Sequence, residues 1–126
     1  MSGLLVRRLL IDLETPFARH WAGGDAFRSA WFNALSMSFP VGEQFFIDSV
    51  KLGLQALPEA KREAMAADVQ GFIGQEATHR RIHALFNGQL ERQGHVNAWA
   101  VRATRRIERL EGLDARAWVA ATAATE

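Results

Sequence analysis

The sequence contains no cysteine and no long apolar run, and its charges nearly cancel. Without cysteine, disulfides and thiolate metal sites are both excluded, so any metal must be held by carboxylates and imidazoles. The 15 basic and 14 acidic residues leave a formal net charge of +1, which gives no general attraction to nucleic acid or to an anionic membrane. No stretch approaches the ~20 apolar residues that a membrane span needs.

The first residues, "MSGLLVRRLLIDLE", place their arginines between two short apolar runs. A secretory signal instead has basic residues followed by one longer apolar run. We therefore expect a soluble, cytoplasmic protein. Its 126 residues suffice for one core but not for two domains.

We expect an amino-terminal arm over residues 1–25, followed by a helical metal-binding domain over residues 26–126. The arm contains a proline and has no sustained period, so it could hold only a short strand or a turn of helix. Two adjacent glycines end the arm, and Asp25 is suited to cap a helix from about Ala26 to Ser38.

Ser38 and Pro40 predict the start of a second helix, because proline is tolerated in a first helical turn. Pro58 ends this helix and opens the next. The buried stripe of the second helix follows helical steps and consists of Phe39, Glu43, Phe46, Val50 and Leu54 or Leu57. A glutamate thus interrupts an otherwise apolar face.

The longest periodic run extends from Glu59 to about Gln93. Its stripe alternates steps of four and three residues and consists of Met65, Val69, Phe72, Glu76, His79, His83, Phe86 and Leu90. The glycines Gly71, Gly74 and Gly88 could kink or break this helix. We also expect Gly74 to let a facing helix approach closely.

Two shorter helices follow, one from Val96 to about Glu111 and one capped by Asp114. Arginines and glutamates alternate on the first, which favours a solvated face over a nucleic-acid surface. The last helix has no stop signal and looks cut in mid-helix. We expect the tryptophans to pack in the core rather than to bind a cofactor; they are Trp21, Trp31, Trp99 and Trp118. The pattern as a whole predicts an all-α class.

Glu76, His79 and His83 share one helical face, and Glu43 interrupts the neighbouring stripe in the same way. Burying a charged carboxylate without a partner costs several kcal/mol, so something must compensate it. Two inward carboxylates with a Glu-x-x-His motif are the ligand arrangement of di-metal sites in helical bundles. His83 could ligate the same ion or orient a ligand. A hydrogen-bonded Glu–His pair without metal is the alternative.

Two segments, "NALSMSFPVGEQFFIDSVK" and "FIGQEATHRRIHALFN", resemble the bacterial family of predicted metal-dependent hydrolases, and "VRR" and "RHW" are similar to that family's arm. The resemblance implies a ferritin-like helical bundle with Glu43, Glu76, His79 and, as a further candidate, His83 as metal ligands. The ion would be divalent iron, zinc or manganese.

Members of that family are longer, with a further glutamate and a second Glu-x-x-His downstream. This chain has no second Glu-x-x-His, and Glu126 could be the first downstream ligand at a cut end. The sequence therefore leaves two expectations open. Either the chain is a fragment, or two copies pair their half-sites across a symmetric interface and form a homo-oligomer.

Three functions remain in view. The first is a metal-dependent hydrolase-like protein acting on a small molecule that the sequence does not identify. The second is a di-iron oxidoreductase or oxygenase, because carboxylate and imidazole ligands also suit iron and dioxygen chemistry. The third is a non-catalytic helical interaction module, in which the glutamates and histidines of the seam are merely paired.

Overall fold

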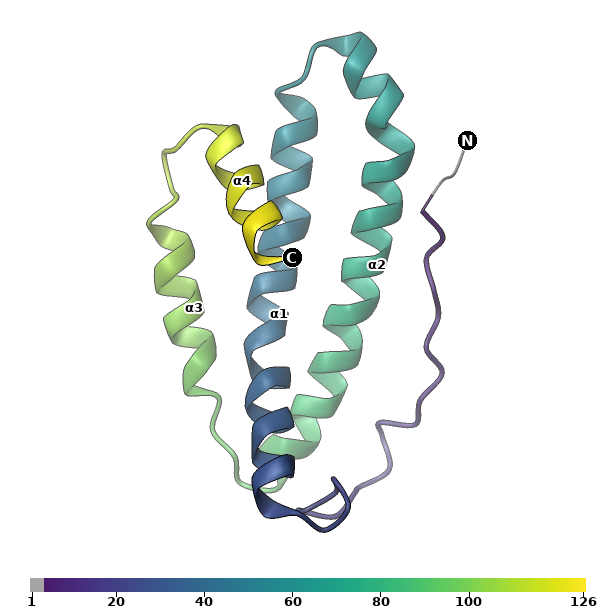
Figure 1. Cartoon of the computed structure of the whole chain (residues 1–126), viewed down its shortest axis with the longest axis vertical. Coiled ribbons are helices and arrows are strands. Elements are labelled where there is room, and N and C mark those ends of the chain that lie inside the picture. Colours follow the sequence, from purple (N-terminus) through teal and green to yellow (C-terminus); the bar gives the residue numbers. More distant parts are fainter. Residues whose placement is uncertain (1–3) are drawn as a thin grey trace.

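The computed structural model describes residues 4–126, and in this range it contains helices and turns but no strand. The helices are α1 (Ala26–Gln55), α2 (Glu59–Arg92), α3 (Ala98–Glu108) and α4 (Ala115–Thr125) (Figure 1). The predicted all-α class is confirmed. Among residues 4–126, no helix combines the length and the apolar character that crossing a membrane requires.

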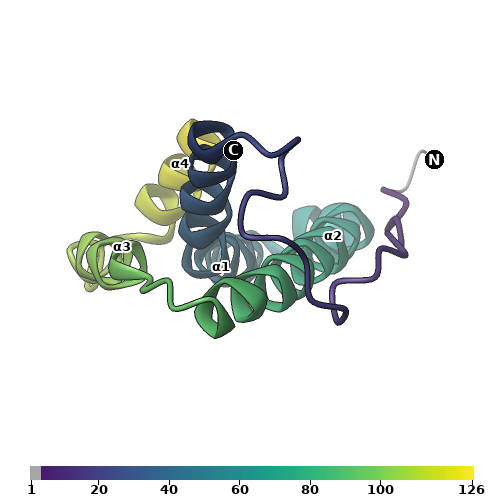
Figure 2. The same ribbon diagram turned by 90° about the horizontal axis from the view of Figure 1, so that it is seen from below.

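Helix α1 is the centre of the molecule, because α2, α3 and α4 each pack against it. Within the described residues these three do not pack against one another. Figure 1 shows α2 on one side of α1 and α3 and α4 on the other, and Figure 2 shows α4 to one side of the row formed by the other three. The result is an open helical bundle.

The predicted break at Ser38 and Pro40 is wrong, since α1 runs through Pro40 as one helix. Proline has no N–H and leaves the carbonyl four residues earlier without its helical partner. Here Asn87 Nδ2 donates a hydrogen bond to that carbonyl oxygen, on Ser36, at 3.1 Å. A side chain of α2 therefore replaces the hydrogen bond that Pro40 cannot make, and α1 continues through the proline.

Helix α2 is unbroken from Glu59 to Arg92 despite its glycines. The expected approach of a facing helix at Gly74 is wrong, because the arm lies there instead. A Cβ atom on Gly74 would lie 2.6 Å from Val6 Cγ2, and one on Gly71 would lie 2.6 Å from Leu4 Cβ. These glycines make room for the arm.

Residues 4–18 of the arm pack along α2 as an irregular chain without a strand. Hydrogen-bonded turns follow at residues 19–24, where the Gly24 N–H donates to the carbonyl oxygen of His20 at 2.9 Å, so the arm contains one of the two features that the sequence allowed, a single helical turn. Gln89 Nε2 donates to the carbonyl oxygens of Leu13 (2.9 Å) and Glu14 (2.8 Å). Gln93 Nε2 donates to the carbonyl oxygen of Phe17 at 2.9 Å. Side-chain amides of α2 thus satisfy the backbone of a segment that has no partner strand.

The predicted helix caps are confirmed. Asp25 accepts a hydrogen bond from the backbone N–H of Arg28 at the start of α1, and Asp114 does the same for Arg116 at the start of α4. Helix α3 starts later than predicted because Asn97 caps it, accepting from the N–H groups of the second and third residues that follow. It also ends earlier, at Glu108, where turns replace the helix.

The tryptophans divide between packed and exposed positions. Trp118 donates its indole N–H to the carbonyl oxygen of Leu110 and lies 5.3 Å, centroid to centroid, from the ring of Phe45. Trp31 is 62% exposed, so its expected core position is wrong. Trp31 borders a shallow groove whose other wall includes Ala98 and Trp99 of α3.

Helix α4 is fastened to α1 by small residues. The hydroxyl groups of Ser49 and Thr122 form a buried hydrogen bond of 2.5 Å. One turn further along α1, Gly53 leaves space for Val119, whose Cγ2 would lie 2.5 Å from an added Cβ. This close packing brings the end of α4 and Glu126 to the side of α1 where α2 also faces.

Candidate metal centre

Three ionisable side chains converge between α1 and α2. Glu43 comes from the middle of α1, and Glu76 and His79 come from the middle of α2. Each offers one ligand atom, and these atoms all lie within 4.8 Å of one another. Glu43 is only 3% exposed and Glu76 only 2%. The helical stripes that the sequence indicated therefore meet at their polar positions.

The two histidines pair with different carboxylates. His79 Nδ1 lies 3.6 Å from Glu76 Oε1, on the same helix. His83 Nε2 lies 3.9 Å from Glu43 Oε1, across the two helices. His83 is outside the compact group of three donors, but it lines the same cavity.

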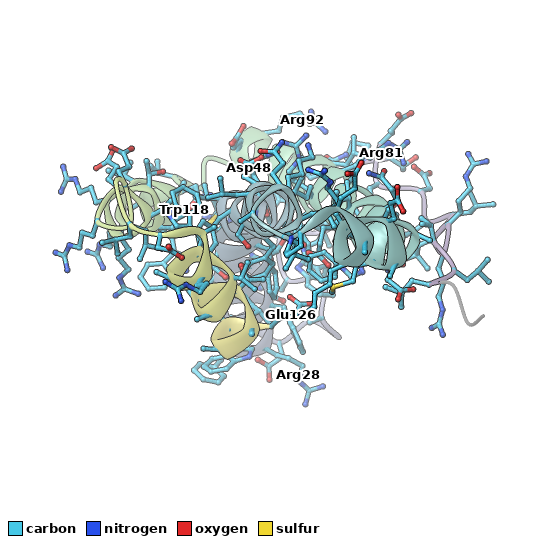
Figure 3. All side chains as sticks on the ribbon, turned by 90° about the horizontal axis from the view of Figure 1, so that it is seen from above. Arg28, Asp48, Arg81, Arg92, Trp118 and Glu126 are labelled. Carbon is cyan, nitrogen blue, oxygen red and sulfur yellow. The ribbon has the colours of Figure 1, made fainter. Side chains whose placement is uncertain are left out.

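The cavity has a volume of about 400 Å³. It is lined by Ser38, Phe39, Gly42, Glu43, Phe46, Glu76, His79, His83, Thr125 and Glu126. Glu126 is exposed and stands apart from the compact group, although its side chain borders the cavity. Figure 3 shows Glu126 on the opposite side of the molecule from Asp48 and Arg81. All five residues singled out from the sequence thus surround one space.

The carboxylates of Glu43, Glu76 and Glu126 repel one another. Burial, followed by the charges of Glu76 and Glu126, raises the pKa of Glu43 from 4.5 to about 7, although Arg80 opposes this. Burial and the charge of Glu126 also raise the pKa of Glu76, against the effect of His79. Carboxylates held close together in a poorly solvated place favour the protonated form.

One acidic oxygen has no partner at all in the described part of the chain. Glu43 Oε2 is buried and makes no hydrogen bond with any of residues 4–126. A buried carboxylate oxygen left in this way is costly unless a cation or a donor meets it. Two carboxylates and an imidazole around such an oxygen are donors that fit divalent iron, zinc or manganese.

His83 is suited to act as a neutral ligand. Burial, followed by the charge of His79, lowers the pKa of His83 below its ordinary value of 6.5. Its ring lies against Phe39, with 4.6 Å between the centroids and 31° between the planes. A neutral imidazole keeps one nitrogen free to bind a metal.

Three residues beside the histidines were not identified from the sequence. Ser36 Oγ lies 2.9 Å from His83 Nδ1 and 2.8 Å from Asn87 Oδ1. Gln75 Nε2 lies 2.8 Å from His79 Nε2. The available signal for Ser36 was its place four residues before a proline, which marks a free carbonyl if the helix continues. No comparable signal marks Asn87 or Gln75.

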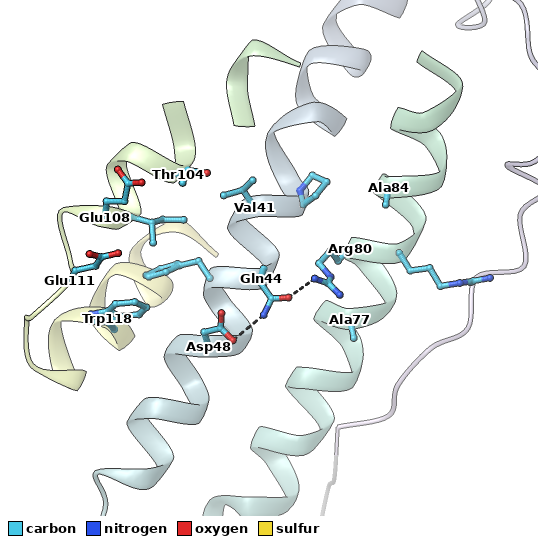
Figure 4. A pocket seen from close by; sticks show the side chains of 14 residues that line it. Val41, Gln44, Asp48, Ala77, Arg80, Ala84, Thr104, Glu108, Glu111 and Trp118 are labelled. Carbon is cyan, nitrogen blue, oxygen red and sulfur yellow. Dashed lines mark hydrogen bonds between the residues drawn. The ribbon is translucent and has the colours of Figure 1, made fainter. Parts of the chain in front are cut away.

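A second, larger groove of about 910 Å³ lies between α1, α2 and α3. In it Arg80 donates to Gln44 Oε1, and the Gln44 amide donates to Asp48 at 2.9 Å (Figure 4). Glu43, Glu76 and His79 do not line this groove. The rest of its lining is largely apolar and includes Val41, Phe45 and Trp118. The convergent metal donors belong to the smaller cavity.

A family model described as "Predicted metal-dependent hydrolase" matches residues 5–126, which include most of the arm and all four described helices. No curated protein matches the chain, and no solved structure does.

Proposed function

Because the chain belongs to the predicted metal-dependent hydrolase family, we propose that it binds a divalent metal ion through Glu43, Glu76 and His79 and uses this ion in hydrolysis. The observation that carries the proposal is the buried convergence of these donors around a Glu43 oxygen without a partner. A cation at this point would relieve the repulsion that raises the pKa values of both glutamates.

The chemistry assigned to each side chain follows from its position. When bound, a divalent ion would polarise the bond to be hydrolysed and lower the pKa of an attacking water toward ~7. Glu43 and Glu76 hold the ion from two helices, so its place is fixed by the α1–α2 packing. Glu126, exposed at the cavity edge, is placed to take a proton from the attacking water on a carboxylate oxygen. The aromatic rings of Phe39 and Phe46 limit the access of bulk water.

The size of the cavity supports a small substrate. A volume of about 400 Å³ falls in the range of small-molecule sites. We propose a small molecule with a hydrolysable bond as the substrate class.

A di-iron oxidoreductase or oxygenase is the second candidate. The same donors suit iron and dioxygen, and the Glu-x-x-His motif on α2 with a glutamate on α1 is typical of carboxylate-bridged iron pairs in bundles. In this proposal α1, α2 and α4 correspond to three of the four helices of a ferritin-like bundle. Glu126, at the end of α4, is then a further metal ligand.

The homo-oligomer remains a proposal as well. Phe27, Trp31 and Leu35 recur at helical spacing on α1 and are all substantially exposed. Exposed apolar stripes of this kind mark surfaces that bind other proteins.

Metal analysis of protein purified without added metal tests these proposals. We expect about one or two divalent ions per chain in the wild type and almost none in Glu76→Gln or His79→Ala, because each loses a donor. Glu63→Gln, an exposed glutamate on the same helix, is the matched control and should keep the metal.

The outcomes separate the candidate functions. Zinc or manganese without an oxo-bridge absorption band supports hydrolysis, whereas iron with such a band supports the oxidoreductase. A protein that carries no metal and unfolds at the same urea concentration with and without chelator contradicts both and leaves the interaction module.

A further inference from the structure

Pro40 creates an unusual acceptor inside α1. Because proline has no N–H, the carbonyl oxygen of Ser36 lacks its helical partner, and Asn87 Nδ2 donates to it at 3.1 Å. Ser36 and Asn87 are both buried. Turning the Asn87 amide round would place Oδ1 against the carbonyl oxygen, two acceptors facing each other without water to separate them. The orientation of this amide is therefore fixed by the proline.

The amide orientation determines the direction of the next hydrogen bond. With Nδ2 at the carbonyl, Asn87 Oδ1 faces Ser36 Oγ at 2.8 Å. Oδ1 is only an acceptor, so the Ser36 hydroxyl must donate its proton there. A hydroxyl has one proton to give. It can therefore meet any further partner only as an acceptor.

That further partner is His83, whose Nδ1 lies 2.9 Å from Ser36 Oγ. Since the hydroxyl has no second proton, Nδ1 must carry a hydrogen and donate it to Oγ. A neutral imidazole has one ring proton, so Nε2 then presents a free electron pair. Nε2 is also the nitrogen nearer to the acidic cluster, 3.9 Å from Glu43 Oε1.

We propose that Ser36 and Asn87 are positioning residues that hold His83 in the tautomer protonated on Nδ1, so that Nε2 is its ligand atom for the metal bound by Glu43. This inference rests on the proposed metal centre and adds an assignment that the Glu-x-x-His motif does not contain. His83 belongs to α2, but its orientation is set by Ser36 of α1. Ser36 can act in this way because Pro40 fixes the Asn87 amide that accepts the Ser36 proton.

The tautomer can be read directly in the metal-free protein. We expect nitrogen-15 NMR of the histidine rings to show His83 protonated on Nδ1 and unprotonated on Nε2, with its signals assigned by their loss in His83→Gln. A His83 ring that carries its proton on Nε2 overturns the inference. Because this measurement uses the wild-type chain without metal, it does not depend on whether a variant folds.

Metal affinity then tests what the tautomer does. Ser36→Ala removes the acceptor of the Nδ1 proton, and we expect it to weaken Co²⁺ binding about 10- to 100-fold in a competition titration. The control is Ser29→Ala. Ser29 is an equally buried serine of α1, and its hydroxyl donates to the carbonyl oxygen of Asp25, far from the cavity. It should bind Co²⁺ as the wild type does.

The two proposals fail in different ways. Wild-type protein that does not bind Co²⁺ contradicts the proposed metal function. Wild-type protein that binds Co²⁺, together with a folded Ser36→Ala variant of equal affinity, contradicts the positioning role alone.

Discussion

The cavity contains two histidine–carboxylate pairs, and they are built differently. His79 and Glu76 are neighbours on one helix turn, and the His79 side chain is 44% exposed. His83 and Glu43 meet across two helices, and the His83 side chain is 29% exposed. The first pair needs only a helix. The second pair also needs the packing of α1 on α2 and the proline inside α1. Its geometry therefore depends on tertiary structure.

The largest expected effect comes from Glu43, the carboxylate of the pair across the helices. Its pKa of about 7 in the folded protein exceeds the ordinary 4.5. Folding therefore takes up a proton between these values, and stability that is fully present below pH 4.5 is lost as the pH rises through 7. The contribution amounts to about 3 kcal/mol at most.

Urea unfolding of metal-free protein at pH 4.5 and pH 7.5 measures this loss. The lowered pKa of His83 acts in the opposite direction, because stability from this group increases as the pH rises toward 6.5. The raised pKa of Glu76 acts in the same direction as that of Glu43. Glu43→Gln removes the Glu43 contribution and leaves Glu76 and His83 in place, so the difference between variant and wild type isolates it. Identical pH profiles for the two proteins would show that Glu43 is not the group responsible.

An intermediate effect on stability is expected where the arm contacts α2 next to the His79–Glu76 pair. Gly74→Ala would place a Cβ 2.6 Å from Val6 Cγ2 and displace the arm, at a cost of about 1–2 kcal/mol. The arm also donates from Arg7 N–H to Gln75 Oε1 at 3.3 Å, so the surroundings of His79 should change while those of His83 do not.

Gly88→Ala is the matched control for the arm. It lies on the same helix with no atom closer than Arg92 Nη1 at 4.0 Å, and alanine there should stabilise the helix by about 0.5–1 kcal/mol. Thermal unfolding and histidine NMR measure both variants. Equal stabilisation by the two alanines would disprove the close contact between the arm and Gly74.

The smallest effect separates the hydrogen-bond supports of the two histidines. Gln75 contacts His79 Nε2 at a partly exposed position, where water can replace its amide. Gln75→Ala should therefore weaken Co²⁺ binding less than about tenfold, and less than Ser36→Ala does. Competition titration of both variants gives the order of their Co²⁺ affinities. A larger loss of affinity in Gln75→Ala than in Ser36→Ala would show that the support of His79 matters more than that of His83.

The parts of the fold that depend on local sequence were predictable. Asp25 and Asp114 gave the helix starts correctly, because capping is local. The stripe on α2 gave the inward face around Glu76 and Leu90, but its first member, Met65, is 48% exposed and was wrong. Pro40 led to the wrong prediction of a helix break. A proline stops a helix only when no other group satisfies the carbonyl four residues before it, here that of Ser36. That group, Asn87, is 51 residues from Ser36 in the chain, and only the packed structure brings it there.

The same limit applies to the candidate site. Glu43, Glu76 and His79 could be chosen from the sequence, because an ionisable residue in a core stripe needs compensation. The role of Gly74 could not, since a glycine permits a close approach without identifying what approaches. Contacts between distant segments, such as Gln75 with the arm, are properties of tertiary packing and leave no local pattern.

The packing of every described helix on α1 alone has a consequence for motion. Helices that share one neighbour but do not contact one another can separate singly, so α4 can detach while α1 and α2 stay paired. Its attachment includes the Ser49–Thr122 bond, the Gly53–Val119 contact and the packing of Trp118 on Phe45. Detachment would carry Glu126 away and leave the other donors in place. One border of the cavity thus depends on a helix that is held by α1 alone, whereas the Glu43, Glu76 and His79 donors depend on the α1–α2 pair.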